Sequence, residues 1–345
     1  MPPSDNPSAA SAPLGIAVAD VFGIEERSLF QRVLGAQSFW VTLALIAICV
    51  VLSILQPAAF ATTDNLFNIT RNFSFIGIMA LGMTAVIITG GIDLSVGSTM
   101  GVVVITTGMV MHGGGSWELA CLVGLGTGLI VGLFNGILIA VLGLSPFVTT
   151  LGTLAIARSA AVVLSQNKMI YEFGDNNQWF FDKLGGGSFL YVAIQVWILI
   201  GMCVVFALCL HWTVWGRHLF AVGGNENAAR VTGVSVYRVK VTAYVLSAMS
   251  AAVAGILILA WQGSAINAVG TGYELRVIAS TVIGGANLIG GEGGSYGAFI
   301  GAALIEVIRN SLLMAGVDSN WQGMFVGAFI ILAVLLERLR GRRRD

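Results

Sequence analysis

The chain has 345 residues, of which 57% are hydrophobic and only 10% are charged, and its formal net charge is zero. A soluble domain typically carries about 25% charged residues, so this composition excludes an ordinary soluble protein and favours a membrane protein. Zero net charge provides no basic field for nucleic acid, and the four cysteines lack metal-binding or redox spacing. We therefore expect neither a nucleic-acid partner nor a bound metal.

The first predicted element is a polar N-terminal tail, residues 1–38, which lacks the pattern of a signal peptide and is expected in the cytoplasm. A helix needs about 20 apolar residues to cross about 30 Å of hydrocarbon. The uncharged run 119–157 is too long for one crossing, and Pro146 divides it. About ten crossings follow, and they make up a membrane domain over residues 39–337. They are predicted at 39–60, 73–91, 94–111, 119–142, 147–164, 189–210, 241–261, 275–289, 296–317 and 324–336.

Basic residues set the predicted orientation, because positively charged loops stay in the cytoplasm. The C-terminal tail 338–345 holds five arginines, and the loop 212–240 holds four basic residues against one acid. The loop 166–188 has mixed charge and is expected outside. Ten crossings with both termini in the cytoplasm satisfy these assignments. The predicted fold class is therefore an all-α polytopic membrane protein with glycine-rich helix breaks.

A single carboxylate lies between the second and third predicted crossings. Asp93 follows Gly90 and Gly91, and it is the only charged residue between Arg71 and Glu118. An acid in such a run is costly unless it lines water, a ligand or another polar group. The glycines suit backbone that leaves helical geometry within the membrane. The pattern predicts a helix break on a translocation pathway. The neighbouring polar residues expected to line it are Ser95, Ser98 and Thr99.

The glycine break has an echo later in the chain. Gly-Gly-Ile-Asp-Leu at 90–94 recurs as Gly-Gly-Ala-Asn-Leu at 284–288. Corresponding glycine-interrupted segments in two parts of a transporter indicate internal pseudo-symmetry around a pathway. Close helix packing through glycine is an equally good explanation. Asn287 is the candidate pathway residue of the second copy.

Two more charges fall inside a predicted crossing. Glu306 and Arg309 are three residues apart, so they share one face of a helix and can form an ion pair. We expect a pair that fixes helix packing. The alternative is that both residues line the pore together with Asn310.

Residues 88–98, Ile-Thr-Gly-Gly-Ile-Asp-Leu-Ser-Val-Gly-Ser, closely resemble the signature of the membrane permeases of bacterial monosaccharide ABC importers. These are the permeases of the ribose, xylose, arabinose and galactose group. Residues 216–234 resemble the cytoplasmic loop of that family which docks on the ATPase. A third match is the pair Asn135-Gly136, followed by residues 146–153. The resemblance covers roughly residues 40–335 and does not identify the sugar.

The resemblance implies a set of partners. Two permease subunits, either two copies or this chain with a paralogue, would form the pathway in the bilayer of the bacterial inner membrane. Two cytoplasmic ATPase domains would drive transport, and a periplasmic sugar-binding protein would deliver the substrate. The chain has no G-x-x-x-x-G-K-[ST] phosphate loop, and none of its lysines follows a glycine-rich turn. We therefore expect no enzymatic activity and no cofactor on this chain, with ATP bound by the partner ATPase.

The loop 212–240 is then the predicted coupling loop, where the ATPase docks. Asn225 is a good helix N-cap, the alanines that follow favour a helix, and Gly233 can end it. A short helix over 225–232 with small residues on one side would fit a groove of the ATPase. An ordinary polar loop is the alternative. The residues expected to take part are Gly224, Asn225, Glu226, Ala228, Ala229, Arg230 and Gly233.

These patterns predict a permease subunit that passes a monosaccharide across the membrane. Asp93 either accepts hydrogen bonds from sugar hydroxyls or accepts backbone N–H groups at a helix start, and the second role is favoured. The main alternative is a secondary transporter driven by an ion gradient, with Asp93 or Glu306 as the proton site. An intramembrane enzyme would require a nucleophile with a base or a metal site, and no such constellation is apparent. Within the leading class, branched-chain amino-acid permeases are distant relatives. Their zwitterionic substrate calls for paired charges in the pathway, which disfavours this alternative here.

Overall fold

The computed structural model describes residues 36–318, together with 321, 323–325, 327–328 and 331. The predicted N-terminal tail up to residue 35 and the arginine-rich tail 338–345 lie outside the described residues. Most of the last predicted crossing, 324–336, also lies outside them. The described part of the chain is almost entirely helical.

Seven of the described helices are long and apolar enough to cross a membrane. They are α3 (Gln37–Leu55), α4 (Thr63–Ile88), α6 (Trp117–Ala140), α7 (Pro146–Leu164), α8 (Ile194–Trp212), α11 (Val236–Gln262) and α13 (Ser295–Met314). Two shorter helices, α5 (Val96–His112) and α12 (Tyr273–Ile283), lie beside the predicted glycine breaks. The count of ten crossings is therefore not confirmed. With 11 residues, α12 is about 17 Å long, too short for the crossing predicted at 275–289.

The loops contain short elements of their own. A turn of 3₁₀-helix, η1 (Asp175–Asn177), a π-helical turn, η2 (Phe180–Gly185), and a hairpin of β1 (Ser188–Phe189) and β2 (Val192–Ala193) precede α8. The hairpin explains why α8 begins at residue 194 and not at the predicted 189. The predicted coupling loop contains two helices, α9 (Val214–Gly224) and α10 (Glu226–Val231).

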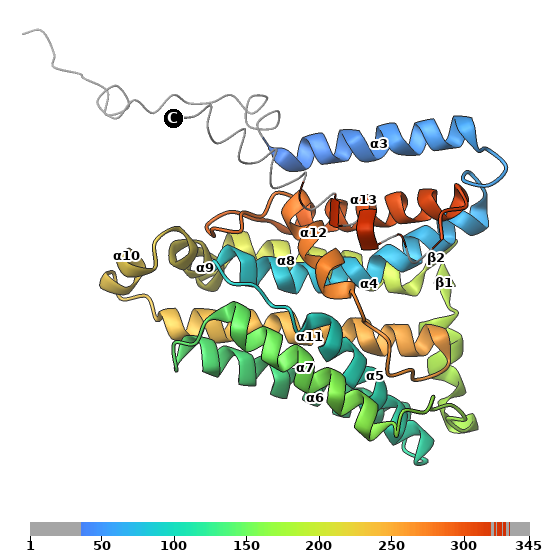
Figure 1. The fold of residues 1–345 in the computed structure, drawn as a ribbon, viewed down its shortest axis with the longest axis horizontal. Helices are drawn as coiled ribbons and strands as arrows, with labels where there is room; N and C mark the ends of the chain where they lie inside the picture. The colour runs from blue at the N-terminus through green and yellow to red at the C-terminus, as the bar shows by residue number, and fades with distance from the viewer. Residues whose placement is uncertain (1–35, 319–320, 322, 326, 329–330, 332–345) are drawn as a thin grey trace, which may run out of the picture. The chain divides into compact units, whose positions relative to one another are not determined.

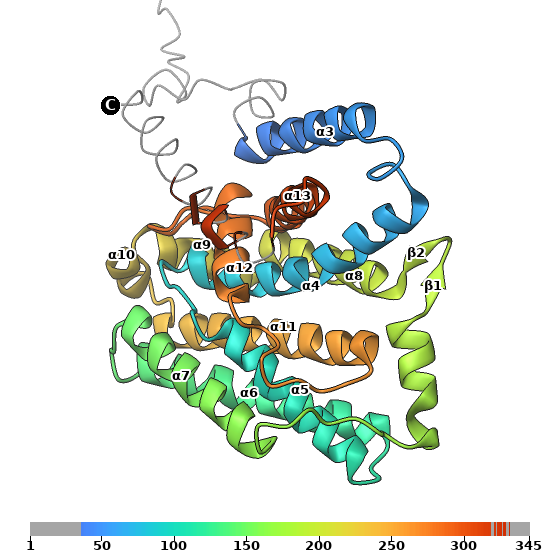
Figure 2. The ribbon, with the colours of Figure 1, turned by 45° about the vertical axis from the view of Figure 1, so that its right-hand side comes forward.

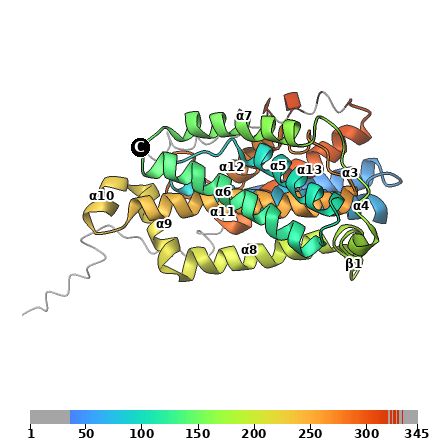
Figure 3. The ribbon, with the colours of Figure 1, turned by 90° about the horizontal axis from the view of Figure 1, so that it is seen from below.

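Helix α11 lies at the centre of the packing. It contacts α6, α4 and α5, and Figures 1 and 2 show it between α4 and the pair α6 and α7. Seen from below, α6 and α7 lie on one side of α11 and α8 lies on the other (Figure 3). Glycines four residues apart on α6 form the contact with α11, and a Cβ on Gly132 would lie only 2.7 Å from Val245 Cα. Small residues thus let the two backbones approach closely, as in membrane helix pairs.

Burial divides the long helices into two groups. Helices α4 and α11 are mostly buried, whereas α3, α6, α7 and α8 expose most of their apolar side chains. Continuous exposed apolar surface of this extent is unfavourable in water and matches a lipid environment. The buried helices α4 and α11 therefore lie where a polar pathway residue can find partners.

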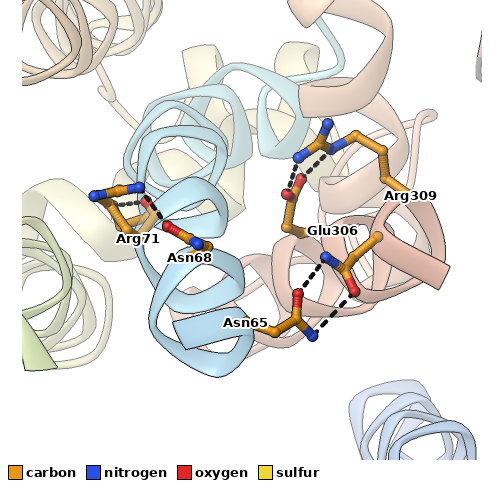
Figure 4. A network of polar contacts seen from close by, with 7 residues as sticks. Asn65, Asn68, Arg71, Glu306 and Arg309 are labelled. Atoms are coloured by element: carbon orange, nitrogen blue, oxygen red, sulfur yellow. Dashed lines mark hydrogen bonds and ion pairs between the residues drawn. The ribbon is translucent and has the colours of Figure 1, made fainter. Parts of the chain in front are cut away.

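Helix α4 begins ten residues before the crossing predicted at 73–91, so the prediction was wrong at this end. The Thr62 hydroxyl caps the helix by accepting a backbone N–H at 3.3 Å. The predicted crossing began after Arg71 and so left this residue outside the helix. Its guanidinium donates to Asn68 Oδ1 at 2.5 Å (Figure 4). It also lies 4.5 Å from the ring centroid of Trp261. These contacts accommodate the cation within the helix. Similarly, α11 begins five residues before the crossing predicted at 241–261.

Candidate functional site

The first glycine break ends α4 by a Schellman motif. The Gly90 N–H donates to the Ile87 carbonyl at 2.8 Å, and the Gly91 N–H donates to the Val86 carbonyl at 3.1 Å. Gly90 has φ +76°, a conformation that side-chain-bearing residues rarely adopt. A Cβ on Gly91 would lie 2.5 Å from the Tyr244 hydroxyl. Both glycines are therefore required where the chain turns away from α4.

Asp93 follows this break and is fully buried. Its Oδ1 accepts the Ser95 N–H at 3.0 Å and the Ser95 hydroxyl at 2.6 Å, and its Oδ2 accepts the Ser247 hydroxyl at 2.8 Å. The bond from the Ser95 N–H to Asp93 forms an Asx turn directly before α5. The dipole of α5 favours a carboxylate near the start of that helix. The carboxylate thus holds the backbone at the start of α5. All three donors are supplied by the protein itself.

The other two polar candidates lie in the first turn of α5. The buried Ser98 hydroxyl donates to the Ser95 carbonyl at 2.9 Å. Thr99 is also buried, and its hydroxyl has no hydrogen-bond partner among the described residues. A buried hydroxyl without a partner is costly unless water or a ligand reaches it.

Polar side chains from neighbouring helices extend the network around Asp93. The Asn135 amide on α6 donates to Ser95 Oγ at 2.9 Å, and the Thr153 hydroxyl on α7 donates to Asn135 Oδ1 at 2.6 Å. Ser247 lies near the middle of the 27-residue α11. The chain of contacts therefore links the break to the middle of α7 and α11 and to the C-terminal part of α6. We call Asp93, Ser95, Asn135, Thr153 and Ser247 the Asp93 network.

Sequence reasoning did not assign Ser247 to the site. The sequence analysis named Asn135 and residue 153 only as part of a match to the permease family, and it gave neither of them a role in the site. The signal that could have found them is an amide or hydroxyl inside a long apolar run, because such groups need partners within the membrane. Their contacts with the Asp93 region depend on how the helices pack against one another, and this packing cannot be inferred from the sequence alone.

The second glycine break repeats the first in detail. The Gly285 N–H donates to the Val282 carbonyl at 2.9 Å, the next N–H bonds five residues back, and Gly285 has φ +104°. Asn287 Oδ1 then accepts the Ile289 N–H at 2.9 Å, the same Asx turn that Asp93 makes with Ser95. The glycine and the Asx residue are one position closer together than in the first copy. The sequence echo is therefore also an echo in backbone structure.

The two breaks are in direct contact. The Gly291 N–H donates to the Ile88 carbonyl at 2.9 Å, which joins the segment after α12 to the last residue of α4. A Cβ on Gly90 would lie 3.2 Å from the Ile289 carbonyl oxygen. The segments that the sequence relates thus lie side by side.

Glu306, Arg309 and Asn310 form a different group, on α13 (Figure 4). Glu306 is buried and pairs with Arg309 through two hydrogen bonds. The Asn310 amide donates to Asn65 Oδ1 at 2.8 Å and so joins α13 to the first turn of α4. Asn65 lies at the opposite end of α4 from the Gly90 break. The structure thus gives these residues contacts within and between helices, apart from the Asp93 network.

The predicted helix in the coupling loop is confirmed. Asn225 Oδ1 accepts the Ala228 N–H at 3.0 Å and caps α10, and Gly233, with φ +87°, follows its end. Val231 is 87% exposed and Ala228 is exposed, so these two residues form a small apolar patch on α10 beside the exposed Asn227 and Arg230. Ala229 was expected to take part in docking of the ATPase, but its side chain is buried against the protein. Its side chain is therefore not available to a partner.

Charged residues connect α10 to α11. Glu226 accepts from Lys240 at 2.6 Å and from Arg230 at 3.0 Å. The hydrogen bond from Lys240 is the main reason why the pKa of Glu226 lies below its usual value. These side chains line a groove of about 570 Å³, whose other wall is the connection between α6 and α7 around Pro146. The coupling loop therefore has a defined conformation and a hollow beside it.

A family model described as "Branched-chain amino acid transport system / permease component" matches residues 65–334. A probable ABC transporter permease protein, y4mJ, of Sinorhizobium fredii is 40% identical over 81% of this chain and 83% of that protein. The ribose import permease protein RbsC of Bacillus subtilis is 37% identical over 86% of this chain and 91% of that protein.

The autoinducer 2 import system permease protein LsrC of Enterobacter sp. is 35% identical over 88% of this chain and 86% of that protein. No solved structure matches the chain at a significant level. The matched region contains both glycine breaks and the coupling loop, so the similarity covers the whole candidate site.

Proposed function

The chain belongs to the family of branched-chain amino acid transport system permease components, and from this premise we propose that it provides the translocation pathway for a monosaccharide. It is the permease component of an ABC importer, a multi-pass membrane protein driven by ATP hydrolysis on a separate subunit. The assignment of a sugar as the substrate rests on the similarity to ribose import permeases over more than four fifths of the chain. This membership favours the ATP-driven importer over a transporter driven by an ion gradient.

The pathway runs past the first glycine break. Support comes from the Asp93 network, which brings hydroxyl and amide groups of α6, α7 and α11 together beside the break. A neutral sugar needs donors and acceptors but no tight cage, because it must leave again. The buried hydroxyls of Thr99 and Thr149 have no hydrogen-bond partner among the described residues, so each can still accept or donate to such a ligand. Asp93 itself acts by holding the start of α5, since its oxygens already accept three protein donors.

The ATPase docks on α10 from the cytoplasm. The exposed Ala228 and Val231 offer a small apolar surface, and Asn225 and Gly233 fix the ends of the helix that presents it. The basic residues of the loop 212–240 support this orientation under the positive-inside rule. Both termini then lie in the cytoplasm, about ten segments cross or enter the bacterial inner membrane, and a second permease completes the pathway. A substrate-binding protein delivers the sugar from the other side.

The test is reconstitution. The chain is incorporated into proteoliposomes with its ATPase, and uptake of labelled ribose is measured with the substrate-binding protein outside and ATP trapped inside. The proposal expects uptake that requires trapped ATP and the ATPase and that a protonophore leaves unchanged. Uptake that a protonophore abolishes, and that proceeds without ATP, would contradict it. A panel of other pentoses and hexoses in the same assay then identifies the preferred sugar.

A further inference from the structure

Three separate parts of the chain meet at backbone contacts beside the first glycine break. They are the end of α4, the end of α9 and the segment between α12 and α13, and Figures 1 and 2 show the last of these reaching α9. The Gly291 N–H bonds to the Ile88 carbonyl at 2.9 Å. Gly223, at the end of α9, packs against the same two groups, and a Cβ on it would collide with the Ile88 carbonyl oxygen and the Gly291 nitrogen. The contact therefore leaves no room for a methyl group.

Gly290 completes this contact. A Cβ there would lie 2.9 Å from the Gly223 carbonyl oxygen and 3.1 Å from the Gly90 nitrogen. Every neighbour in these contacts is a backbone atom, so no side-chain rotation can absorb a displacement. Closely packed interiors transmit such shifts and do not deform freely. We call Ile88, Gly223, Gly290 and Gly291 the glycine junction.

The glycine junction lies between the coupling loop and both helix breaks. On one side, Gly223 is two residues before Asn225, the N-cap of α10. On the other side, Ile88 is two residues before Gly90, and the chain continues to Asp93 and its partners. The segment of Gly290 and Gly291 belongs to the second break. Backbone contacts alone therefore connect the residues next to α10 with both breaks.

We infer that the glycine junction transmits engagement of the ATPase at α10 to the two glycine breaks and so links ATP hydrolysis to opening of the pathway. This inference rests on the proposed function. Gly223 acts as a positioning residue: it contacts no substrate, and its role is to let α9 press directly on the backbone of the breaks. Its own φ is ordinary, since it is not among the glycines with positive φ.

Gly223→Ala isolates this contact. Alanine has no backbone strain at an ordinary φ, and it is a better helix former than glycine. The change therefore acts through the collision with Ile88 and Gly291. Gly126→Ala on α6 is the matched control, because a Cβ on Gly126 meets no atom within 4 Å and the residue has no part in the junction.

The experiment measures uptake, ATP hydrolysis and copurified ATPase for wild type, Gly223→Ala and Gly126→Ala in the reconstituted importer. Coupling between two sites typically amounts to a factor of about 5–150. We expect Gly223→Ala to lower sugar transported per ATP hydrolysed by a factor in this range while the ATPase still copurifies. Gly126→Ala should match wild type. A wild-type ratio of transport to hydrolysis in Gly223→Ala would overturn the inference, whereas absence of ATP-dependent uptake in wild type would overturn the proposed function.

Hydrogen exchange in the wild-type complex gives a second readout that does not depend on the variant folding. Trapping the ATPase in its nucleotide-bound state should change the exchange of residues 225–233, 86–91 and 286–293 together. A change confined to 225–233, with the two break segments unaltered, would contradict transmission through the glycine junction.

Discussion

Replacement of Asp93 by alanine or by asparagine separates the two tasks of its carboxylate. Alanine leaves three buried donors without their acceptor, namely the Ser95 N–H, the Ser95 hydroxyl and the Ser247 hydroxyl. A buried polar group without a partner costs about 1–3 kcal/mol, so Asp93→Ala should destabilise the protein by about 3–9 kcal/mol. Asparagine keeps one oxygen for the Ser95 N–H, and its amide can donate to the Ser247 hydroxyl oxygen. Asp93→Asn should therefore cost only about 1 kcal/mol.

The assay compares thermal unfolding of the purified variants, followed by tryptophan fluorescence, with uptake per folded molecule in proteoliposomes. We expect the unfolding temperature to fall in the order wild type, Asp93→Asn, Asp93→Ala, and uptake to fall in both variants. Ser247→Ala is the control that leaves the Asx turn intact and removes one donor to the carboxylate. Equal heat stability of the alanine and asparagine variants would refute the hydrogen-bond reasoning. Wild-type uptake by Asp93→Asn would show that the charge has no part in transport.

Three further predictions concern other contacts. Asn135→Leu removes the donor to Ser95 Oγ and the acceptor of Thr153, and it should lower stability by about 1–3 kcal/mol in thermal unfolding; no change would place Asn135 outside the network. Glu306→Gln leaves Arg309 without its ion partner and should cost about 3–5 kcal/mol, of which Glu306→Met with Arg309→Met recovers a large part. Should the double variant unfold no later than the single one, the loss does not come from an unpaired Arg309. Because the pKa of Glu226 is lowered on folding, its contribution is present above the unfolded pKa and is lost as pH falls through the folded value. Hydrogen exchange of residues 225–233 should accelerate as pH is lowered from about 5 to about 3, after correction for intrinsic rates, and Glu226→Gln should abolish this dependence.

Local sequence predicted the features that local physics controls. The double glycine before Asp93 indicated a helix break, and Gly90 has the positive φ that only glycine adopts readily. Asn225 as N-cap and Gly233 beyond the helix end predicted α10 correctly. The spacing of three residues between Glu306 and Arg309 predicted their pair. In each case the interacting groups lie within a few residues of one another.

Features that depend on packing between helices were not predictable in this way. Ser247 is 154 residues from Asp93, and no periodicity of α11 distinguishes it from other small residues on that helix. Ala229 was assigned to the docking face because it is small, but the fold turns it inward. The start of α4 was misjudged because Arg71 was taken to lie outside the helix, whereas Asn68 and the ring of Trp261 accommodate it.

The separation of 154 residues between Asp93 and Ser247 has a consequence for how the protein is made. Ribosomes add about 5–20 residues per second, so the acid emerges about 8–30 s before the hydroxyl that completes its shell. During that interval the only structure available to the carboxylate is its own Asx turn and, later, α6 and α7. The surrounding lipid disfavours a charge. The full set of hydrogen bonds around Asp93 can therefore form only after α11 has been synthesised, whereas the Asx turn with Ser95 can form as soon as α5 begins.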